Sequence, residues 1–167
     1  MPATDQNGPL LRDQICFRLY AASRLVTRLY QPVLAPLGLT YPQYIILMIL
    51  WEFSPCRIGV LGEQARLNSN TLAPLLKRLQ EQGMIERQRD PSDERAVRIA
   101  LTAQGWALRE TCRVIPARLL AELGLDAPGL ASLRDELDQL LQVLDHSAGT
   151  DALASEAVEL GGGGMLA

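Results

Sequence analysis

The sequence predicts a mainly helical chain with one small β-hairpin, and two observations support this prediction. Between residues 10 and 83, apolar residues recur every three or four positions, which is the spacing of one helix face. Between residues 84 and 102 the period shortens to two, on either side of the turn-rich sequence PSDER. Pro and Gly residues separate the periodic segments and indicate where each one ends.

The first helix is predicted from about residue 10 to about residue 34. Its apolar stripe consists of Ile15, Leu19, Ala22, Val26, Leu29 and Val33. Cys16 follows Ile15 within the sequence DQICFRLYAA and shares a neighbouring stripe with Tyr20, Ser23, Thr27 and Tyr30, either as core filler or as a reactive thiol. Pro36 and Gly38 end the helix, because proline cannot continue it and glycine favours its C-terminal turn.

Three more helices are predicted before the hairpin. LTYPQYIILMILWE begins one of them, with Thr40 and Gln43 at capping-box spacing, and FSPC ends it. RIGVLGEQARL predicts a short helix. NSNTLAPLLKRLQEQG predicts a longer one, which is capped by Ser69 or Asn70 and ends at Gly83.

Two helices are predicted after the hairpin. Thr102 caps the first, which runs to about Leu123, and Asp126 and Pro128 begin the second, which runs to about Leu144. The order helix, helix, short helix, helix, hairpin, helix, helix is typical of a winged helix-turn-helix, in which the hairpin forms the wing.

Length and charge are compatible with one DNA-binding domain. The net charge of the 167 residues is −3, but residues 1–121 carry about +5 and residues 122–167 about −8. The overall balance therefore does not exclude a basic face. No signal peptide is visible, and the longest apolar run, Tyr44–Trp51, is too short to span a bilayer. We expect a cytoplasmic protein with no membrane partner.

Cysteine and histidine usage argues against a metal site. Cys16, Cys56 and Cys112 lie far apart without C-x-x-C spacing, and His146 is the only histidine. We therefore expect no metal and no other cofactor. In a reducing compartment the cysteines would be free thiols, either buried or reactive.

The predicted helix-turn-helix and wing supply candidate DNA-binding residues. The second helix of such a unit enters the major groove with its N-terminal side chains at the base edges. Arg95 at the wing tip can enter a narrow minor groove, and we interpret Asp93 as orienting it through a salt bridge. The candidates are Asn68, Ser69, Asn70, Thr71, Lys77, Arg78, Arg87, Arg89, Asp93 and Arg95. Alternatively, the polar cluster only caps the helix and the arginines are solvated.

Two groups of motifs resemble known regulators. LKRLQEQGMIERQRDPSDERAVRIALTAQG resembles the recognition-helix end and wing of the MarR family, with the Asp-x-Arg wing motif at Asp93-Glu94-Arg95. QICFRLY, LTYPQYIILMILWE and TLAPLLKRL together resemble a narrower branch, the organic hydroperoxide resistance regulators (OhrR). The resemblance covers about residues 10–145. It implies a homodimer that binds double-stranded DNA at a pseudo-palindromic operator.

The resemblance also implies a division of the chain. We expect a flexible N-terminus at 1–9, a MarR-type winged helix domain at 10–146 and a disordered tail at 147–167. Within the domain, dimerisation helices at about 10–36 and 103–146 would flank a DNA-binding unit at about 40–102.

In the OhrR branch, organic hydroperoxides oxidise a cysteine near the start of the first helix, and tyrosines hold it. By resemblance, Cys16 takes this position, Tyr30 and Tyr41 take those of the phenols, and Tyr20 matches a further nearby tyrosine. On one straight helix, Cys16 and Tyr30 would be about 21 Å apart. If they are partners, Tyr30 must therefore come from a second copy packed antiparallel across a two-fold axis.

The expected function is a homodimeric repressor, not an enzyme, that releases its operator when an organic hydroperoxide oxidises Cys16 to a sulfenic acid. Phenol O–H groups can stabilise a thiolate without a cation and leave the pocket apolar. Some members of the branch carry a resolving cysteine between the fifth and sixth helices, where this sequence has none. We expect Cys56 and Cys112 to be inert, and oxidised Cys16 to be trapped by a low-molecular-weight thiol or by overoxidation.

Several alternatives stay open. A MarR-type repressor can instead be released by a small phenolic or aromatic ligand, with Cys16 incidental. A thiol peroxidase would turn peroxide over, although the chain lacks a matching resolving cysteine and a general-base histidine. A helical dimerisation protein that does not bind DNA would show no salt-sensitive binding to a duplex. An isolated cysteine on an apolar helix face is, in general, most often a small hydrophobe.

Overall fold

A computed structural model describes residues 10–122, 124 and 126–149. The side chains of residues 12, 94, 95, 122, 148 and 149 lie outside this description. The chain divides after Leu119 into two compact units, and each is described by itself.

The N-terminal segment forms one long helix between two short turns. A 3-10 turn at Leu11–Asp13 precedes α1, Ile15–Leu34, and a second 3-10 turn follows at Ala35–Leu37. Gly38 then adopts a φ of 69°, a left-handed conformation that glycine tolerates best, and redirects the chain. The predicted first helix and its stop are therefore confirmed, although the α-helix begins at residue 15.

Helix α2, Tyr41–Phe53, lies in the centre of the first unit. The Thr40 backbone N–H donates to Oε1 of Gln43 at 2.8 Å, so the predicted helix start is confirmed. Its Ile46, Leu47 and Leu50 side chains are fully buried. Because this helix is apolar on most sides, neighbouring elements pack around it.

Helices α3, Ile58–Ala65, and α4, Ser69–Glu81, form the helix-turn-helix. Arg66 turns the chain between them with a left-handed φ of 53°. Leucines from both helices join the same core: Leu61, Leu72, Leu76 and Leu79. Burial of this face leaves the opposite face of α4 to solvent.

The cap of α4 differs from the prediction by one or two residues. Oδ1 of Asn68 accepts hydrogen bonds from the backbone N–H and the hydroxyl of Thr71, both at 2.9 Å. The predicted caps, Ser69 and Asn70, lie instead inside the first turn. All these residues are good caps, so sequence alone does not choose among them.

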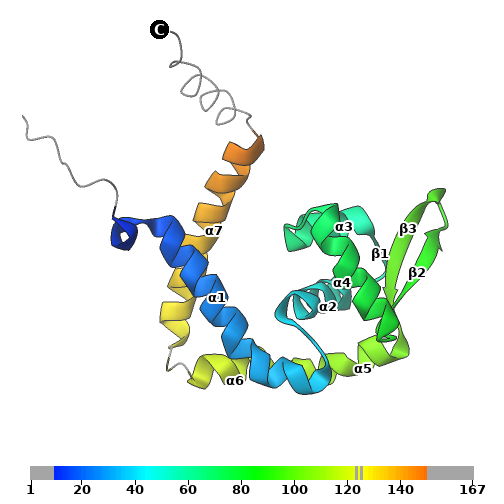
Figure 1. Cartoon of the computed structure of the whole chain (residues 1–167), viewed down its shortest axis with the longest axis horizontal. Coiled ribbons are helices and arrows are strands. Elements are labelled where there is room, and N and C mark those ends of the chain that lie inside the picture. The colour runs from blue at the N-terminus through cyan, green and yellow to red at the C-terminus, as the bar shows by residue number, and fades with distance from the viewer. Residues whose placement is uncertain (1–9, 123, 125, 150–167) are drawn as a thin grey trace, which may run out of the picture. The chain divides into compact units, whose positions relative to one another are not determined.

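The predicted hairpin is confirmed as β2, Ile85–Asp90, and β3, Asp93–Leu101, which pair antiparallel. A third strand, β1 at Cys56–Arg57, pairs with the other side of β3 and was not predicted. Two residues are too short to display a strand period. Figure 1 shows the hairpin extending beyond the group formed by α2, α3 and α4.

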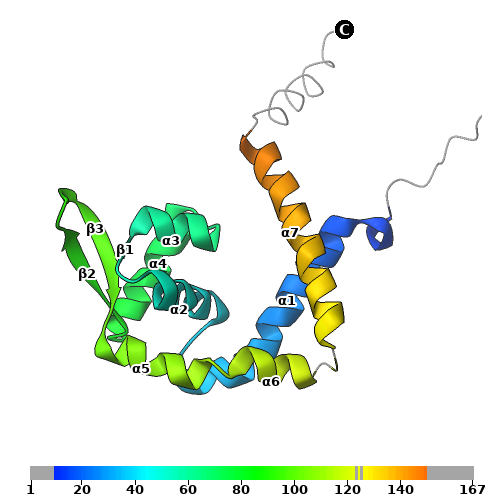
Figure 2. The same cartoon turned by 180° about the vertical axis from the view of Figure 1, so that it is seen from behind.

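The single helix predicted from Thr102 to about Leu123 is wrong, because the structure has two helices there. Helix α5 covers Ala103–Cys112, and α6 covers Ile115–Glu122. Pro116 explains the break, since it has no N–H for the preceding turn and disfavours helical backbone at the residue before it. The cap is confirmed, because the Thr102 hydroxyl accepts from the Gly105 backbone N–H at 3.2 Å. Figure 2 shows α5 leading away from the base of the hairpin.

Helix α7, Ala127–Gly149, forms most of the described part of the second unit, which begins within α6 at Leu120. Oδ1 of Asp126 accepts from the Gly129 backbone N–H at 3.0 Å, which confirms the predicted start. The helix continues past the predicted end near Leu144, and the rest of the predicted tail lies outside the described residues.

Within the described part of the chain, no single helix is both long and apolar enough to cross a membrane. The segments Ile15–Leu37 and Tyr41–Phe53 meet that test of length and composition only together, and they are bent by 76° at their junction. The described residues also contain no group of three or more His, Cys, Asp or Glu side chains that could hold a metal ion.

Candidate functional site

Three tyrosines gather where the end of α1 meets the start of α2. The ring centroids of Tyr30 and Tyr41 are 4.7 Å apart, and that of Tyr44 lies 5.8 Å from Tyr30 and 6.4 Å from Tyr41. Tyr44 is only 2% exposed. The structure thus brings together the two predicted phenols and adds Tyr44, which the sequence analysis missed. Its spacing of three from Tyr41 on a predicted helix was the available signal.

Burial raises the pKa of each of these phenols. For Tyr30 the charge of an ionised Tyr41 adds to this effect. The pKa of Tyr44 reaches about 12, first through burial and then through Tyr30, Cys112 and Tyr41. The cluster therefore offers neutral O–H donors at physiological pH.

Cys16 lies at the other end of the same helix and is exposed. Tyr20, one turn further on, is also exposed, and the Arg24 guanidinium carbon lies 5.7 Å from the centre of its ring. Along the α1 axis, Cys16 and Tyr30 are about 21 Å apart. A single chain therefore does not bring the thiol to the phenol cluster.

The other two cysteines are buried. Cys56 lies in β1 and Cys112 at the end of α5. Burial raises the pKa of both thiols, so the reactive thiolate form is disfavoured in each. These environments support the expectation that both are inert.

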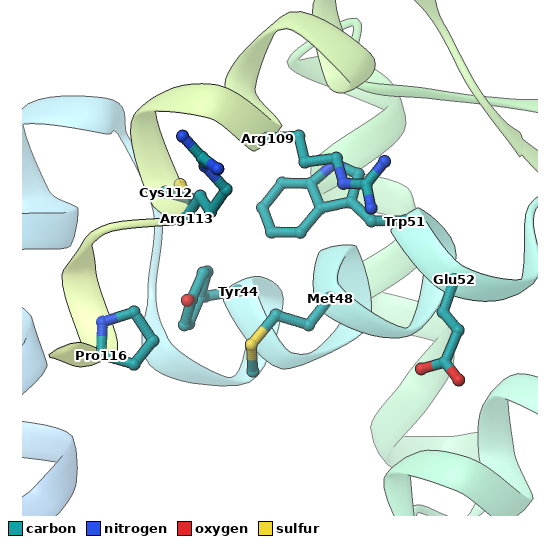
Figure 3. Close-up of a pocket in the computed structure, with 8 residues that line it drawn as sticks. All are labelled: Tyr44, Met48, Trp51, Glu52, Arg109, Cys112, Arg113 and Pro116. Carbon is teal, nitrogen blue, oxygen red and sulfur yellow. The ribbon is translucent and has the colours of Figure 1, made fainter.

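A pocket of about 410 Å³ lies next to the tyrosine cluster, between α2 and α5. Figure 3 shows Tyr44, Met48 and Trp51 of α2 along one wall. Trp51 is fixed in place, because its Nε1–H donates to the carbonyl of Gly105 at 2.9 Å. The other lining residues are Glu52, Arg109, Cys112, Arg113 and Pro116.

The N-terminal half of α4 carries most of the helix residues predicted to bind DNA. Their side chains are exposed at Asn68, Ser69, Asn70, Thr71, Lys77 and Arg78. The Asn68 and Thr71 side chains are bonded to each other, so they fix the helix start. Lys77 pairs with Glu81 at 3.8 Å on the surface.

The wing arginines differ in their surroundings. Nε of Arg87 donates to Oε1 of Gln80 at 3.1 Å and so ties β2 to the end of α4. Arg89 is exposed on the same strand, and Asp93 is exposed at the start of β3. The Arg95 side chain lies outside the described residues, so its predicted minor-groove role stays a prediction.

A carboxylate that the sequence analysis did not single out, Asp90, organises the turn end of the wing, where β2 ends. Asp90 is 6% exposed, and its Oδ2 accepts from Nε of Arg57 at 2.7 Å. Its Oδ1 accepts from the Ser92 backbone N–H at 2.9 Å and from the Ser92 hydroxyl at 2.6 Å. These bonds, the one from Arg57 first, lower the pKa of Asp90 well below its usual range. Arg57 is distant in sequence, so no local pattern indicates the pair.

Comparisons with known proteins agree with this architecture. The model of the MarR family matches residues 39–97. The organic hydroperoxide resistance transcriptional regulator of Bacillus subtilis (strain 168) is 43% identical over 134 residues, which is 80% of this chain and 91% of that protein. The HTH-type transcriptional regulator TtmR of Methylorubrum extorquens (strain PA1) is 37% identical over 154 residues, or 92% and 79% of the two chains.

Solved structures give the same result. The crystal structure of AbfR of Staphylococcus epidermidis has a TM-score of 0.70 and 36% identity, over 81% of this chain and 94% of that one. Reduced AbfR bound to DNA has a TM-score of 0.66 and the same identity, over 80% and 94%. AbfR is also known in an overoxidised form bound to DNA and in a disulfide form, with TM-scores of 0.65 and 0.56.

Proposed function

Because this chain belongs to the MarR family of transcriptional regulators, we propose that it is a homodimeric repressor that releases its operator when an organic hydroperoxide oxidises Cys16. The observation that carries the proposal is the separation of thiol and phenols on one helix. Cys16 is exposed at the start of α1, whereas Tyr30 stacks on Tyr41 near its end. A second copy with its α1 antiparallel would place its own Cys16 against these hydroxyls.

Exposed apolar side chains support burial against a second copy. On α1, Ile15 and Leu25 are 59% and 61% exposed. On α7, the leucines are spaced alternately by three and four residues, as in helices that pair with other helices. They are Leu130, Leu133, Leu137, Leu140 and Leu144. MarR regulators bind DNA as dimers, which agrees with this interpretation.

The chemical step is a two-electron oxidation of sulfur. The Cys16 thiolate attacks the terminal oxygen of the hydroperoxide, an S–O bond forms and the O–O bond breaks. The sulfur becomes a sulfenic acid, and the leaving alkoxide takes a proton to become an alcohol. Neutral O–H groups of Tyr30 and Tyr41 would stabilise the attacking thiolate without a cation, which keeps the site suited to apolar peroxides.

Oxidation would act on DNA binding through the same contacts. A sulfenic acid is larger and more polar than a thiol, so it breaks the hydrogen bonds to the Tyr30 and Tyr41 hydroxyls across the dimer. In the reduced dimer, the two α4 helices would enter major grooves one helical turn apart. A change of about 3 kcal/mol in the balance between reduced and oxidised arrangements lowers operator affinity roughly 150-fold.

A gel shift on the promoter of its own gene tests the proposal. The reduced wild type should bind, and cumene hydroperoxide should release it. Cys16→Ser should bind equally well but stay bound after peroxide, whereas the matched control Cys112→Ala should respond like wild type. Release of Cys16→Ser by peroxide would contradict the sensor role.

Mass spectrometry identifies the fate of the oxidised sulfur. We expect one modified thiol per chain, at Cys16, as a mixed disulfide with a small thiol or as an overoxidised acid. A Cys16–Cys112 disulfide as the main product would contradict the one-cysteine sensor.

The pocket between α2 and α5 favours a second candidate, release by a small phenolic or aromatic ligand. Trp51 and Tyr44 offer apolar walls, and Arg109 and Arg113 add positive charge to the lining. In this case an aromatic acid should release Cys16→Ser from DNA without any peroxide, and Arg109→Gln should weaken that response. The first proposal predicts no such release.

A further inference from the structure

Pro74 occupies an unfavourable place in α4. Proline inside a helix removes one backbone hydrogen bond and crowds the preceding turn, so the carbonyl of Asn70 receives no helical N–H from this residue. Pro74 is exposed and does not belong to the hydrophobic core. Nothing in the packing of the first unit therefore requires a proline here. Such departures from local preference are most often found at functional positions.

The buried face of α4 shows on which side of the helix Pro74 lies. Leu72, Leu76 and Leu79 point into the core. At about 100° per residue, Asn70, Pro74 and Lys77 form a stripe on the opposite side. The N-terminal part of this stripe, Asn70 and Pro74, would face the floor of the major groove, whereas Lys77, nearly one turn further along α4, would approach the phosphate backbone.

Only some of the polar groups at this end of α4 are available for DNA. The Asn68 carboxamide oxygen is engaged by Thr71, and the Thr71 hydroxyl donates to it. Asn70 is exposed and its amide does not take part in this cap. Asn70 therefore presents both a donor and an acceptor directly beside the apolar ring of Pro74.

We propose that Asn70 and Pro74 determine the base preference of this regulator, with Asn70 reading an adenine and Pro74 contacting the methyl group of a thymine. The proposal rests on the placement of α4 in the major groove under Proposed function.

The chemistry of the groove decides between the bases. Adenine offers an acceptor, N7, and a donor, N6–H, which match the Asn70 amide; guanine offers two acceptors and leaves Oδ1 of Asn70 unpaired. The Pro74 ring has no hydrogen-bonding group, and thymine carries a methyl group at the edge of the major groove. Asn70 and Pro74 are one helical turn apart, about 6 Å, so their contacts fall on nearby base pairs.

Selection from a pool of randomised duplexes tests the first contact. The full-length reduced protein should select one A·T pair at a fixed position in each half-site. Asn70→Ala should lose the preference at that pair alone, with affinity for the selected duplex reduced roughly 5- to 150-fold. Lys77→Gln is the matched control, because loss of a phosphate contact should weaken all sequences alike.

Replacing thymine by deoxyuridine tests the second contact. Removing one methyl group should weaken wild-type binding about fourfold at the contacted pair. Pro74→Ser should bind the two duplexes equally. Because serine is a better helix residue than proline, this variant should unfold at a higher temperature than wild type, so weaker binding cannot be attributed to unfolding.

The outcomes separate this inference from the function on which it rests. An unchanged base preference in Asn70→Ala, or equal wild-type binding to thymine and deoxyuridine duplexes, overturns the inference alone. A wild-type protein that selects no duplex overturns the proposed repressor together with it.

Discussion

At the scale of single residues, Asp90 joins parts of the chain that are far apart in sequence. Its bonds to Arg57 and Ser92 connect β1 to the turn between β2 and β3. The wing therefore takes its orientation partly from the strand that precedes α3. We infer that the angle between the wing and α4 depends on this carboxylate as well as on the strand pairing.

Asp90→Asn should make the free energy of unfolding less dependent on pH in the acid range. The folded-state pKa of Asp90 is lowered, so its stabilisation is fully present above the ordinary carboxyl pKa near 4 and is lost as the pH falls below it. Urea denaturation should show that the variant is less stable than wild type at pH 7 and that the difference narrows by pH 3. Asp135→Asn, an exposed change on α7, is the control and should track wild type. If the difference in stability between Asp90→Asn and wild type stayed constant with pH, the ionised Asp90 carboxylate would not be the source of the stabilisation.

Tyr30→Phe should slow oxidation of Cys16 without unfolding the protein. The substitution keeps the ring that stacks on Tyr41 and removes only the hydroxyl. Loss of one hydrogen bond to the thiolate should slow the reaction with cumene hydroperoxide roughly tenfold. Both tyrosine variants are made in the parent Cys56→Ala/Cys112→Ala, where loss of free thiol reports Cys16 alone. Tyr20→Phe is the comparison. Equal rates for Tyr30→Phe, Tyr20→Phe and the parent would show that the Tyr30 hydroxyl does not assist the oxidation.

At the scale of elements, the packing of α5 against the sheet depends on one glycine. A Cβ built on Gly105 would lie 2.2 Å from the backbone oxygen of Met84 and 2.9 Å from Leu101. The close approach also positions the Gly105 carbonyl that accepts from Trp51. Helix α5 therefore lies directly on the strand pair that forms the wing.

Gly105→Ala should destabilise the fold by about 3 kcal/mol or more, because backbone atoms must move to admit the methyl group. Gly59→Ala is a matched control in α3, where an added Cβ meets nothing within 4 Å. That variant should be neutral or up to about 1 kcal/mol more stable. Thermal unfolding of both proteins measures the contrast, and equal stability would show that α5 is not held this closely.

The sequence predicts elements well where the signal is local. Helix periodicity and caps at Thr40, Thr102 and Asp126 predict helix starts that the structure confirms. Features that depend on distant partners were missed. Strand β1 exists only because β3 lies beside it. The break before α6 occurs at Pro116, within an apolar pattern that otherwise continues from α5.

The candidate site shows the same division. Cys16, Tyr30 and Tyr41 were identified by resemblance, and the structure shows that the two tyrosines touch. The helix period indicates that Tyr44 neighbours Tyr41 on α2, but its contact with Tyr30 depends on how α1 packs against α2, which no spacing within one helix reveals. A contact between Cys16 and these tyrosines would form only between two chains, so it stays a prediction.

At the scale of the whole molecule, we expect the leucine stripe of α7 to hold two copies together. Leu133 and Leu137 are 49% and 37% exposed, which is unfavourable for side chains of this size in water. Leu133→Asp/Leu137→Asp should therefore sediment as a monomer and lose operator binding. Asp138→Asn, a polar change on the same helix, should remain dimeric. A double variant that stays dimeric would place the contact surface elsewhere.

The position of Trp51 gives the protein an optical reporter of its own state. Its indole lies 6.1 Å from Tyr44, edge to face, and Tyr44 adjoins the phenols expected to meet the sulfur. The chain has two tryptophans, so Trp106→Phe leaves Trp51 as the single tryptophan, whose emission can be excited apart from that of the tyrosines. Ultraviolet emission from that variant should then change when peroxide is added. The emission of Cys16→Ser in the same background should not change. Oxidation could thus be timed in solution without a dye or a radiolabelled duplex.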